Sequence, residues 1–431
     1  MIACLVTTVH EADDARIFHK QAKTLVTAGY EVVLLAPGKE RHKNGKRTRM
    51  RPDEGGRVLQ DRANEPAGRF RAGMPERSQR VAEAPKTIYL PIPRMRFLRL
   101  VAGGTVALFA ALRQRAQVFH LHDPELLPIG LVLKAVGKKV IYDVHEDYPE
   151  QMLTKHYLPV PVRRAASSLV NLVEKAIASR LDGIVCATET IAGKFWPTRP
   201  GLRARSAWVT VVRNYPVFSA SLPRQPVMGN GNRFRLIHLS ETLTPERGIA
   251  SMVRALERLD DRFELILGGR FVTAAYENFI RSLAGFRRVR LVGRVPHEQV
   301  WDWYRASDAG LVCLLPLPRY QASLPVKLFE FMAAGLPVVV SDFPRFREVV
   351  ARNRCGFCVD PENPDEIAAA VRWLAQDREM AREMGEHGRQ AVAETYNWQQ
   401  DARRMLELYD RILRSGQSAA QGQSVLGVRR V

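Results

Sequence analysis

The sequence predicts an α/β fold in two halves, each built on a parallel sheet with helices on its faces. The first observation is a βαβ pattern at the start of the chain, where apolar runs at 2–8 and 31–37 flank a helix that ends at Gly29. The second is a polar span rich in Pro and Gly at 219–232, after which strand and helix patterns alternate again. We therefore expect two α/β domains joined by a linker.

Charge and cysteine content narrow the class of partner and the compartment. The 431 residues carry a formal charge of +20, from 65 Lys and Arg against 45 Asp and Glu. This excess indicates an anionic partner, with nucleotide phosphates, anionic lipid and nucleic acid as candidates. The chain starts without a signal-peptide pattern, and no apolar run is long enough to span a bilayer. Five scattered cysteines suit a reducing compartment, so we expect a cytoplasmic protein.

A basic region interrupts the first half. Residues 39–84 contain 13 Lys and Arg, 7 Asp and Glu, and few large apolar residues. Such a stretch cannot bury enough apolar surface to order itself, and we interpret it as a disordered insertion.

The region from 84 to 122 has no acidic residue. A strongly apolar segment with basic flanks runs within it from Arg94 to Leu112. One interpretation is a helix at an anionic membrane surface, with Phe97, Leu98 and Leu100 in the apolar layer. The alternative is a helix that covers the sheet and has basic ends.

The remaining pattern of the first half is regular. We expect strands at 118–123, 139–143, 182–188 and 208–212, and helices at 161–180 and 189–195.

Polar residues follow the first predicted strand, where open α/β sheets bind their ligands. They are His10, Asp13, Asp14 and Arg16, and no G-x-G-x-x-G loop accompanies them. A dinucleotide site of that type is therefore not expected. The alternative role for these residues is ordinary helix capping.

Two further strand ends are rich in histidine. His120 and His122 alternate with apolar residues and share a face, Asp123 follows them, and His145 and Glu146 follow the next strand. These groups lie at two strand ends rather than as a preformed pair on one helix, so we expect no metal there.

The second half repeats the alternation to the end of the chain. Expected strands lie at 234–239, 263–267, 289–292, 310–315 and 338–341, and expected helices at 248–258, 273–283, 297–306 and 325–334. Helices at 363–377 and 378–395 precede a final helix that ends at Leu413, and the tail from Ser415 is expected to be disordered. Cys355 and Cys358 are interpreted as small core residues.

The most informative stretch is 323–342, a helix that starts near Pro325 and stops at Gly335, followed by an apolar strand. Ser323 can accept hydrogen bonds from the free N–H groups of the first turn, which form an anion site with the helix dipole. Lys327 adds a positive charge, and Glu330 lies one turn further on the same face. This arrangement suits a nucleotide diphosphate and its ribose. The alternative is an amphipathic helix with an ordinary ion pair between Lys327 and Glu330.

The same stretch resembles the donor-binding helix of glycosyltransferase family 4, which has the GT-B fold of two Rossmann-like domains facing across a cleft. The matching residues are Pro325, Lys327, Phe329, Glu330, Met332, Ala333, Gly335 and Pro337. Further strings resemble one branch of the family: the run from Asp14 to Ala22, the run from His120 to Pro128, and the run from Tyr142 to Glu146. The resemblance covers nearly the whole chain outside the insertion and the tail.

The resemblance implies roles for individual residues. Glu330 takes the position that binds the ribose hydroxyls, and Ala322 stands where many members have a first glutamate. Arg247 beside Gly248 matches a phosphate-contacting residue, with Glu241 where many members have glycine, and Arg294 lies beside the base. The implied donor-binding residues are Arg247, Gly248, Arg294, Ser323, Leu324, Lys327 and Glu330.

The catalytic and acceptor-side residues follow in the same way. The implied catalytic residues are His122, Asp123, Arg247 and Lys327, and the implied acceptor-side cleft is lined by His10, Asp13, Arg16, His145 and Glu146. The implied domains are 1–215 for the acceptor, 216–395 for the donor, and 396–414 as a helix that crosses back.

The implied reaction is glycosyl transfer with retained anomeric configuration, without metal or cofactor. The donor would be UDP- or GDP-linked, and the acceptor lipid-linked or a polysaccharide, met at the inner face of the cell membrane. One rival is a nucleotide-sugar epimerase on the same fold. Another is a non-catalytic protein that binds polyanions; nucleic acid is not expected, because the basic residues are not interleaved with exposed aromatic residues.

Overall fold

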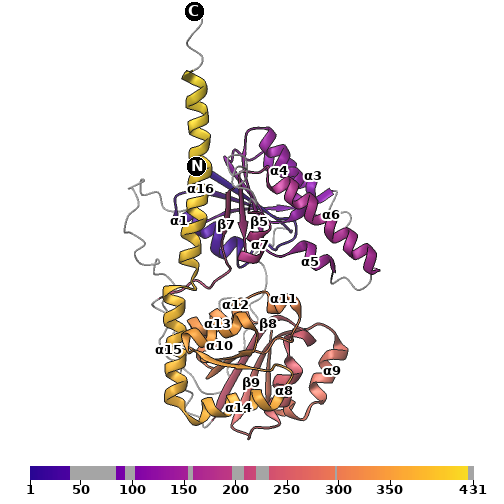
Figure 1. Ribbon diagram of the computed structural model, residues 1–431, viewed down its shortest axis with the longest axis vertical. Helices are drawn as coiled ribbons and strands as arrows, with labels where there is room; N and C mark the ends of the chain where they lie inside the picture. Colours follow the sequence, from indigo (N-terminus) through magenta and orange to yellow (C-terminus); the bar gives the residue numbers. More distant parts are fainter. Residues whose placement is uncertain are drawn as a thin grey trace, which may run out of the picture. The chain divides into compact units, whose positions relative to one another are not determined.

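The structure is a computed structural model that describes residues 1–38, 84–92, 102–153, 159–196, 208–219, 233–296 and 299–425, the last ten as backbone only. The predicted insertion at 39–84 and the basic segment Arg94–Leu100 lie almost entirely outside these residues. The chain forms two compact units, one around each of two sheets (Figure 1).

The first unit contains a seven-stranded sheet in the order β3-β2-β1-β4-β5-β6-β7. Its strands are β1 Ile2–Val6, β2 Glu31–Pro37, β3 Lys86–Leu90, β4 Val118–Leu121, β5 Lys139–Val144, β6 Gly183–Cys186 and β7 Trp208–Val211. The pairs from β3 to β5 are parallel, as the βαβ pattern predicts. Strand β3 was not predicted, because it lies at the sheet edge and only its last residue, Leu90, is buried.

The helices of the first unit are η1 Ile17–Ala22, α1 Lys23–Thr27, α3 Gly104–Leu112, α4 Leu127–Ala135, α5 Tyr148–Leu153, α6 Val160–Ala178 and α7 Glu189–Gly193. Helix α3 packs beside α4, and α4 beside α6 (Figure 1). Of the helix predicted from Arg94 to Leu112, the part within the described residues is α3.

The second unit contains a six-stranded parallel sheet in the order β10-β9-β8-β11-β12-β13. Its strands are β8 Phe234–Leu243, β9 Phe263–Phe271, β10 Val289–Gly293, β11 Ala309–Val312, β12 Val338–Ser341 and β13 Gly356–Val359. Its helices include α8 Ile249–Leu256, α9 Ala274–Ser282, α10 Val300–Arg305, α11 Pro318–Gln321, α12 Val326–Ala333 and α13 Pro344–Asn353. Two parallel sheets of this kind confirm the predicted fold class.

Three helices complete the second half: α14 Pro364–Gln376, α15 Arg378–Glu394 and α16 Trp398–Val425. Helix α16 continues to Val425, beyond the expected end at Leu413, and the expected disorder of the tail from Ser415 stays a prediction. The added segment contains no Pro, although Gly416 and Gly422 lower its helix propensity. Within the part of the chain that the structure describes, no helix combines the length and the apolar character needed to cross a membrane.

Helix α12 is held rigidly in the core of the second unit. Leu328, Phe329, Phe331 and Met332 are buried, at the spacing of one helix face and its flanks. A Cβ atom on Gly310 of β11 would come within 2.3 Å of the Phe331 ring, so this glycine lets α12 pack close to the sheet. The helix ends before Gly335, whose positive φ of 75° terminates it as predicted.

Candidate functional site

Three polar side chains bond one another at the start of α12: Lys327 and Glu330 of α12, and Tyr304 of α10. The Lys327 ammonium donates to Glu330 Oε2 at 2.8 Å, and the Tyr304 hydroxyl donates to the same oxygen at 2.7 Å. Lys327 Nζ also lies 3.1 Å from the Tyr304 oxygen. Tyr304 is fully buried, whereas Lys327 and Glu330 remain partly accessible. The predicted ion pair therefore exists, and a buried tyrosine fixes its carboxylate.

Ser323 does not have the predicted capping role. Its hydroxyl donates to the Arg319 carbonyl oxygen at 2.8 Å, because Ser323 completes the turn that ends α11. The residue at the cap position of α12 is Pro325, which has no side-chain acceptor. The first N–H groups of α12 are thus not capped by a side chain, and the positive end of its dipole remains available to an anion.

A second loop reaches the strand that precedes α11 and α12. Gly248 adopts a left-handed conformation, with φ of 71°, and a Cβ atom there would lie 1.8 Å from the Cys313 carbonyl oxygen. The Leu315 N–H also donates to the Glu246 carbonyl at 2.9 Å. Only glycine permits this approach, which fixes the loop that carries Arg247.

His238 on β8 links the two cationic residues electrostatically. Burial, together with the charges of Arg247 and Lys327, lowers its pKa to about 4, against the opposing effect of its hydrogen bond to Leu311. Its Nδ1 lies 3.0 Å from the Leu311 carbonyl oxygen, so Nδ1 carries the hydrogen and the ring is neutral. Arg247 and Lys327 therefore both oppose protonation of this buried imidazole.

Glu241 does not face the site as an isolated carboxylate. It pairs with Arg294 at 3.7 Å, and both side chains are largely exposed. Leu324 is half-buried immediately before the cap of α12, and Ala322 ends α11. Glu241 and Ala322 are the two residues that differ from the family pattern. The structure accommodates both locally, Glu241 in an ion pair and Ala322 at the end of a turn.

The polar strand ends of the first unit converge on one residue that the sequence analysis did not select. Asp143, fully buried near the end of β5, accepts from Arg16 Nη2 at 2.9 Å and also from Gln21. His120 Nε2, His122 Nδ1 and His145 Nε2 lie 3.6–3.7 Å from its Oδ2 atom. A lone carboxylate in the apolar run Lys139–Val144 was the signal available in the sequence.

The electrostatics of this histidine cluster follow from burial. Burial lowers the pKa of His120 to about 4 and that of His122 well below its ordinary value. Burial also opposes ionisation of Asp143, but the charge of Arg16 outweighs it and holds the pKa of Asp143 well below the usual range. At neutral pH the interior of the cluster thus holds the ion pair of Arg16 and Asp143, together with the neutral imidazoles of His120 and His122.

The outer edge of the cluster is formed by His10 and Asp123. Asp123 Oδ2 accepts from the Thr8 N–H at 2.6 Å and from the Thr7 hydroxyl at 2.9 Å, while its Oδ1 lies 3.5 Å from His10 Nε2. Burial lowers the pKa of His10, but Asp14 and Asp123 more than compensate and raise it above its ordinary value. His10 can therefore hold a proton at the surface of this cluster.

The catalytic and acceptor-side residues predicted in the first unit separate into two groups, those that meet in the histidine cluster and those that lie exposed beside it. His10, Arg16, His122, Asp123 and His145 meet in the cluster, but Arg16, His122 and Asp123 are buried. Arg16 is an internal ion-pair partner and not an open cleft residue. Asp13 and Glu146 are exposed beside the cluster, and Glu146 bonds Gln151. Asp14 accepts from the Arg16 and Ile17 N–H groups, which is the capping alternative.

His120, His122 and Asp143 also have the arrangement of metal ligands, with one ligand atom of each within 4.8 Å of the others. Asp143 is already neutralised by the buried Arg16 guanidinium, whose charge opposes a cation at the same place. The expectation that no metal binds stays a prediction.

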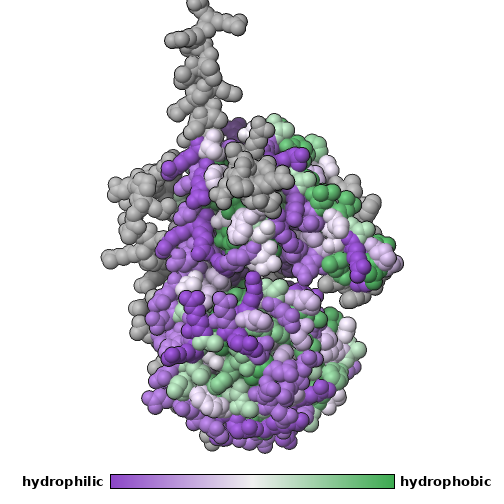
Figure 2. All heavy atoms as spheres, viewed as in Figure 1, coloured by the Kyte–Doolittle hydropathy of each residue, from purple (hydrophilic) through white to green (hydrophobic). Residues whose placement is uncertain are grey.

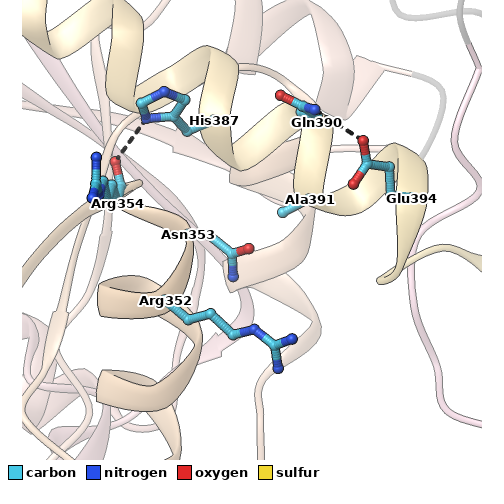
Figure 3. A pocket seen from close by; sticks show the side chains of 7 residues that line it. All are labelled: Arg352, Asn353, Arg354, His387, Gln390, Ala391 and Glu394. Carbon is cyan, nitrogen blue, oxygen red and sulfur yellow. Dashed lines mark hydrogen bonds between the residues drawn. The ribbon is translucent and has the colours of Figure 1, made fainter.

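A pocket of about 280 Å³ lies elsewhere in the second unit (Figure 3). It is lined by the end of α13 and by α15, including Arg352, Arg354, His387 and Glu394. In a parallel sheet the helices start at the carboxyl edge, so the end of α13 lies at the opposite edge from the first turn of α12. This pocket is therefore not part of the α12 site.

Two family models match the chain in series. The model described as "Glycosyl transferase 4-like domain" matches residues 15–196, and "Glycosyl transferases group 1" matches residues 229–391. They fall on the first and second units respectively, and the second includes Arg247, Lys327 and Glu330.

Individual proteins agree with these matches. An uncharacterized glycosyltransferase of Methanocaldococcus jannaschii is 26% identical over 170 residues, which cover 39% of this chain and 42% of that protein. The alignments with the first curated relatives span 30% to 66% of their lengths.

Solved structures match almost the whole chain. Sucrose-phosphate synthase from Thermosynechococcus elongatus is 18% identical with a TM-score of 0.67, covering 96% of this chain and all of that one (100%). Anabaena HepE, in complex with UDP-glucose, is 14% identical with a TM-score of 0.61, covering 95% of this chain and 99% of its own. This likeness establishes the fold as GT-B.

We predict that Asp143→Asn destabilises the protein by about 3–5 kcal/mol, because it leaves the buried Arg16 charge without a partner. Urea unfolding followed by circular dichroism measures the change. Asp342→Asn is the matched control: Asp342 pairs with Arg347 at the surface, and its loss should cost no more than about 1 kcal/mol. Equal effects of the two substitutions would contradict a central role for Asp143.

We predict that stability falls as the pH is lowered from 6.5 towards 4. His120 and His238 have ordinary values of 6.5 and folded values of about 4, so in this window the unfolded chain binds protons that the folded chain excludes. Each contributes up to about 1.4 kcal/mol per pH unit. The raised pKa of His10 acts above this window: its contribution to stability is complete below pH 6.5 and is lost as the pH rises through the folded value.

Urea midpoints at several pH values test this dependence. His238→Gln should flatten the profile, since it removes one of the excluded protons. A midpoint that does not change between pH 6.5 and about 4.5 would show that the buried histidines protonate without cost.

Proposed function

This chain belongs to the glycosyltransferases of family 4 type with the GT-B fold, and we propose that it transfers a sugar from a UDP- or GDP-linked donor to a glycan or lipid-linked acceptor. The observation that carries the proposal is the start of α12, where the ion pair of Lys327 and Glu330 spans the first two turns beside an uncapped helix N-terminus. The uridine diphosphate sugar in the complex of HepE, a neighbour in fold, supports this class of donor.

The proposed donor pose uses each polar group for one part of the nucleotide. Glu330 accepts hydrogen bonds from the two ribose hydroxyls, and Tyr304 keeps its carboxylate in position. The diphosphate lies at the start of α12, where free N–H groups, Lys327 and Arg247 meet it. Arg294, which is exposed, lies beside the base. At Leu324 and Gly248 the backbone of the loops approaches the nucleotide closely. Ser323 also contributes its backbone, because its side chain does not cap α12.

The proposed chemistry needs charge stabilisation more than a strong base. The bond between the anomeric carbon and the diphosphate oxygen breaks, and negative charge grows on the leaving diphosphate. Lys327, Arg247 and the α12 dipole stabilise that charge, which is why we propose transfer without metal or cofactor. The acceptor oxygen forms the new bond on the same face and passes its proton to the departing diphosphate oxygen, which gives retention.

On the acceptor side the exposed edge of the histidine cluster is the proposed participant. His10 and His145 are accessible, whereas His122 and Asp123 are buried behind them. We therefore propose that His122 and Asp123 act by holding His145 and His10 in place. The basic excess of the chain favours an anionic acceptor or surface, such as a lipid-linked acceptor at the inner face of the cytoplasmic membrane.

A thermal-shift screen tests the donor class directly. UDP, GDP, ADP and their glucose and mannose derivatives are added to the full chain, since a ligand that binds only the folded state raises the melting temperature. UDP or GDP should raise it, and mass spectrometry should then detect a glycosylated product with a lipid extract or glycan. Release of an epimerised sugar nucleotide would instead identify an epimerase. No shift with any nucleotide would overturn the proposal.

We predict that Glu330→Gln weakens binding of the effective nucleoside diphosphate about 10- to 100-fold, since hydrogen bonds to a charged acceptor contribute about 1.5–3 kcal/mol. Lys327→Met should weaken it similarly, and Tyr304→Phe less, because it only loosens the carboxylate. Isothermal titration calorimetry measures the dissociation constants.

Glu277→Gln is the matched control. Glu277 also pairs with a basic residue on a helix of the second unit, Arg281 of α9, but it lies away from α12. Its substitution should leave nucleotide binding unchanged. If Glu330→Gln binds as tightly as the control, the ribose site has been assigned to the wrong residue.

A further inference from the structure

Helix α6 has its polarity inverted relative to an ordinary surface helix. The side chains that it turns inward include Glu174, which accepts from the buried Tyr142 hydroxyl at 2.8 Å, and Ser167, which donates to the Pro149 carbonyl at 2.7 Å. Its largest apolar side chains point outward: Leu169 is 61% exposed and Leu172 is 67% exposed. A helix that only covered a sheet would show the reverse.

The outward residues form one continuous stripe. Val162, Ala165, Leu169, Leu172, Val173 and Ala176 follow the spacing of a single helix face, and all but the two alanines are large apolar residues. No charged residue lies within the stripe. Arg164 and Lys175 border it along one side.

The neighbouring helices extend the same apolar surface. Helix α4 packs beside α6 and exposes Val132 and Val136, and α3 packs beside α4 and exposes Phe109 and Leu112. Figure 2 shows apolar residues gathered over the region that these helices occupy in Figure 1. We call the outward side chains of α3, α4 and α6 the apolar face.

The charge around the apolar face decides which partner fits it. Across α3, α4 and α6 the one acidic residue is Glu174, and it is buried. Basic residues such as Arg113, Arg164 and Lys175 lie at the margin. A second copy of the chain would bring basic margins together. A bilayer with anionic headgroups would satisfy both features, because its apolar layer can receive the apolar face and its headgroups can pair with the basic margin.

We propose that the apolar face docks on an anionic lipid bilayer, with the α6 stripe entering the boundary between headgroups and acyl chains. This inference deepens the proposed membrane location and rests on it, but it does not depend on which nucleotide the second unit binds. The face would hold the first unit at the surface where a lipid-linked acceptor lies.

Vesicle sedimentation of the full chain tests the proposal. The wild-type chain should sediment with vesicles of phosphatidylglycerol and phosphatidylcholine, and binding should fall with added salt and on phosphatidylcholine alone. Leu169→Gln with Leu172→Gln should weaken binding by about tenfold or more, since each leucine loses its transfer into the apolar layer. Circular dichroism and the melting temperature establish that the variant is folded.

The matched control is Val272→Gln with Phe279→Gln, two residues of the second unit that are 48% and 42% exposed. It should sediment like the wild type. Equal loss in both variants, or no loss in the α6 variant, would overturn the proposal.

Light scattering after gel filtration without lipid tests the competing partner. A wild-type dimer that the α6 substitutions convert to a monomer, with vesicle binding unchanged, would show that the face joins two copies and would overturn the proposal. The nucleotide screen separates the two hypotheses: vesicle binding without any nucleotide shift would remove the proposed function and leave this inference standing.

Discussion

Parallel strand pairing is the constraint on which the rest of this structure depends. Strands that run in parallel need helical crossovers, and these helices cover both faces of each sheet, so polar chemistry is confined to the carboxyl edge. In the first unit this edge gathers the ends of β1, β4 and β5 around Asp143. In the second it brings the loop after β8, with Gly248, close to Cys313 at the end of β11. Both sites follow from the order of the strands.

In the donor site that we propose at α12, one arrangement both stabilises the fold and prepares the binding of a ligand. The ion pair of Lys327 and Glu330 is an ordinary feature of a helix surface, and the buried Tyr304 hydroxyl adds a third member that fixes the carboxylate. A nucleotide that replaces the contacts of Lys327 meets a carboxylate already in place. The two interpretations of this helix, as an amphipathic element and as a donor site, therefore describe the same atoms.

The sequence predicted the elements that are long, apolar and regularly spaced, and it failed where tertiary contacts decide the outcome. Apart from β3 and β13, the strands of both sheets follow from local patterns, and so does the glycine that ends α12. The edge strand β3 has too few buried residues to form a pattern. Ser323 was assigned to the wrong helix end, because only the fold shows that α11 comes directly before it. Asp143 was overlooked because its partners come from three other segments.

The inverted polarity of α6 has a consequence for local unfolding. Of its 19 residues only Glu174 and Ala178 are buried, so the helix contributes little to the core and loses little by separating from it. Helix α12 buries five of its eight residues and can open only with the core around it. The amide hydrogens of α6 should therefore exchange with solvent through small local openings, and those of α12 through global unfolding. The first unit thus contains a segment that can change its exposure while the sheet beneath it stays intact.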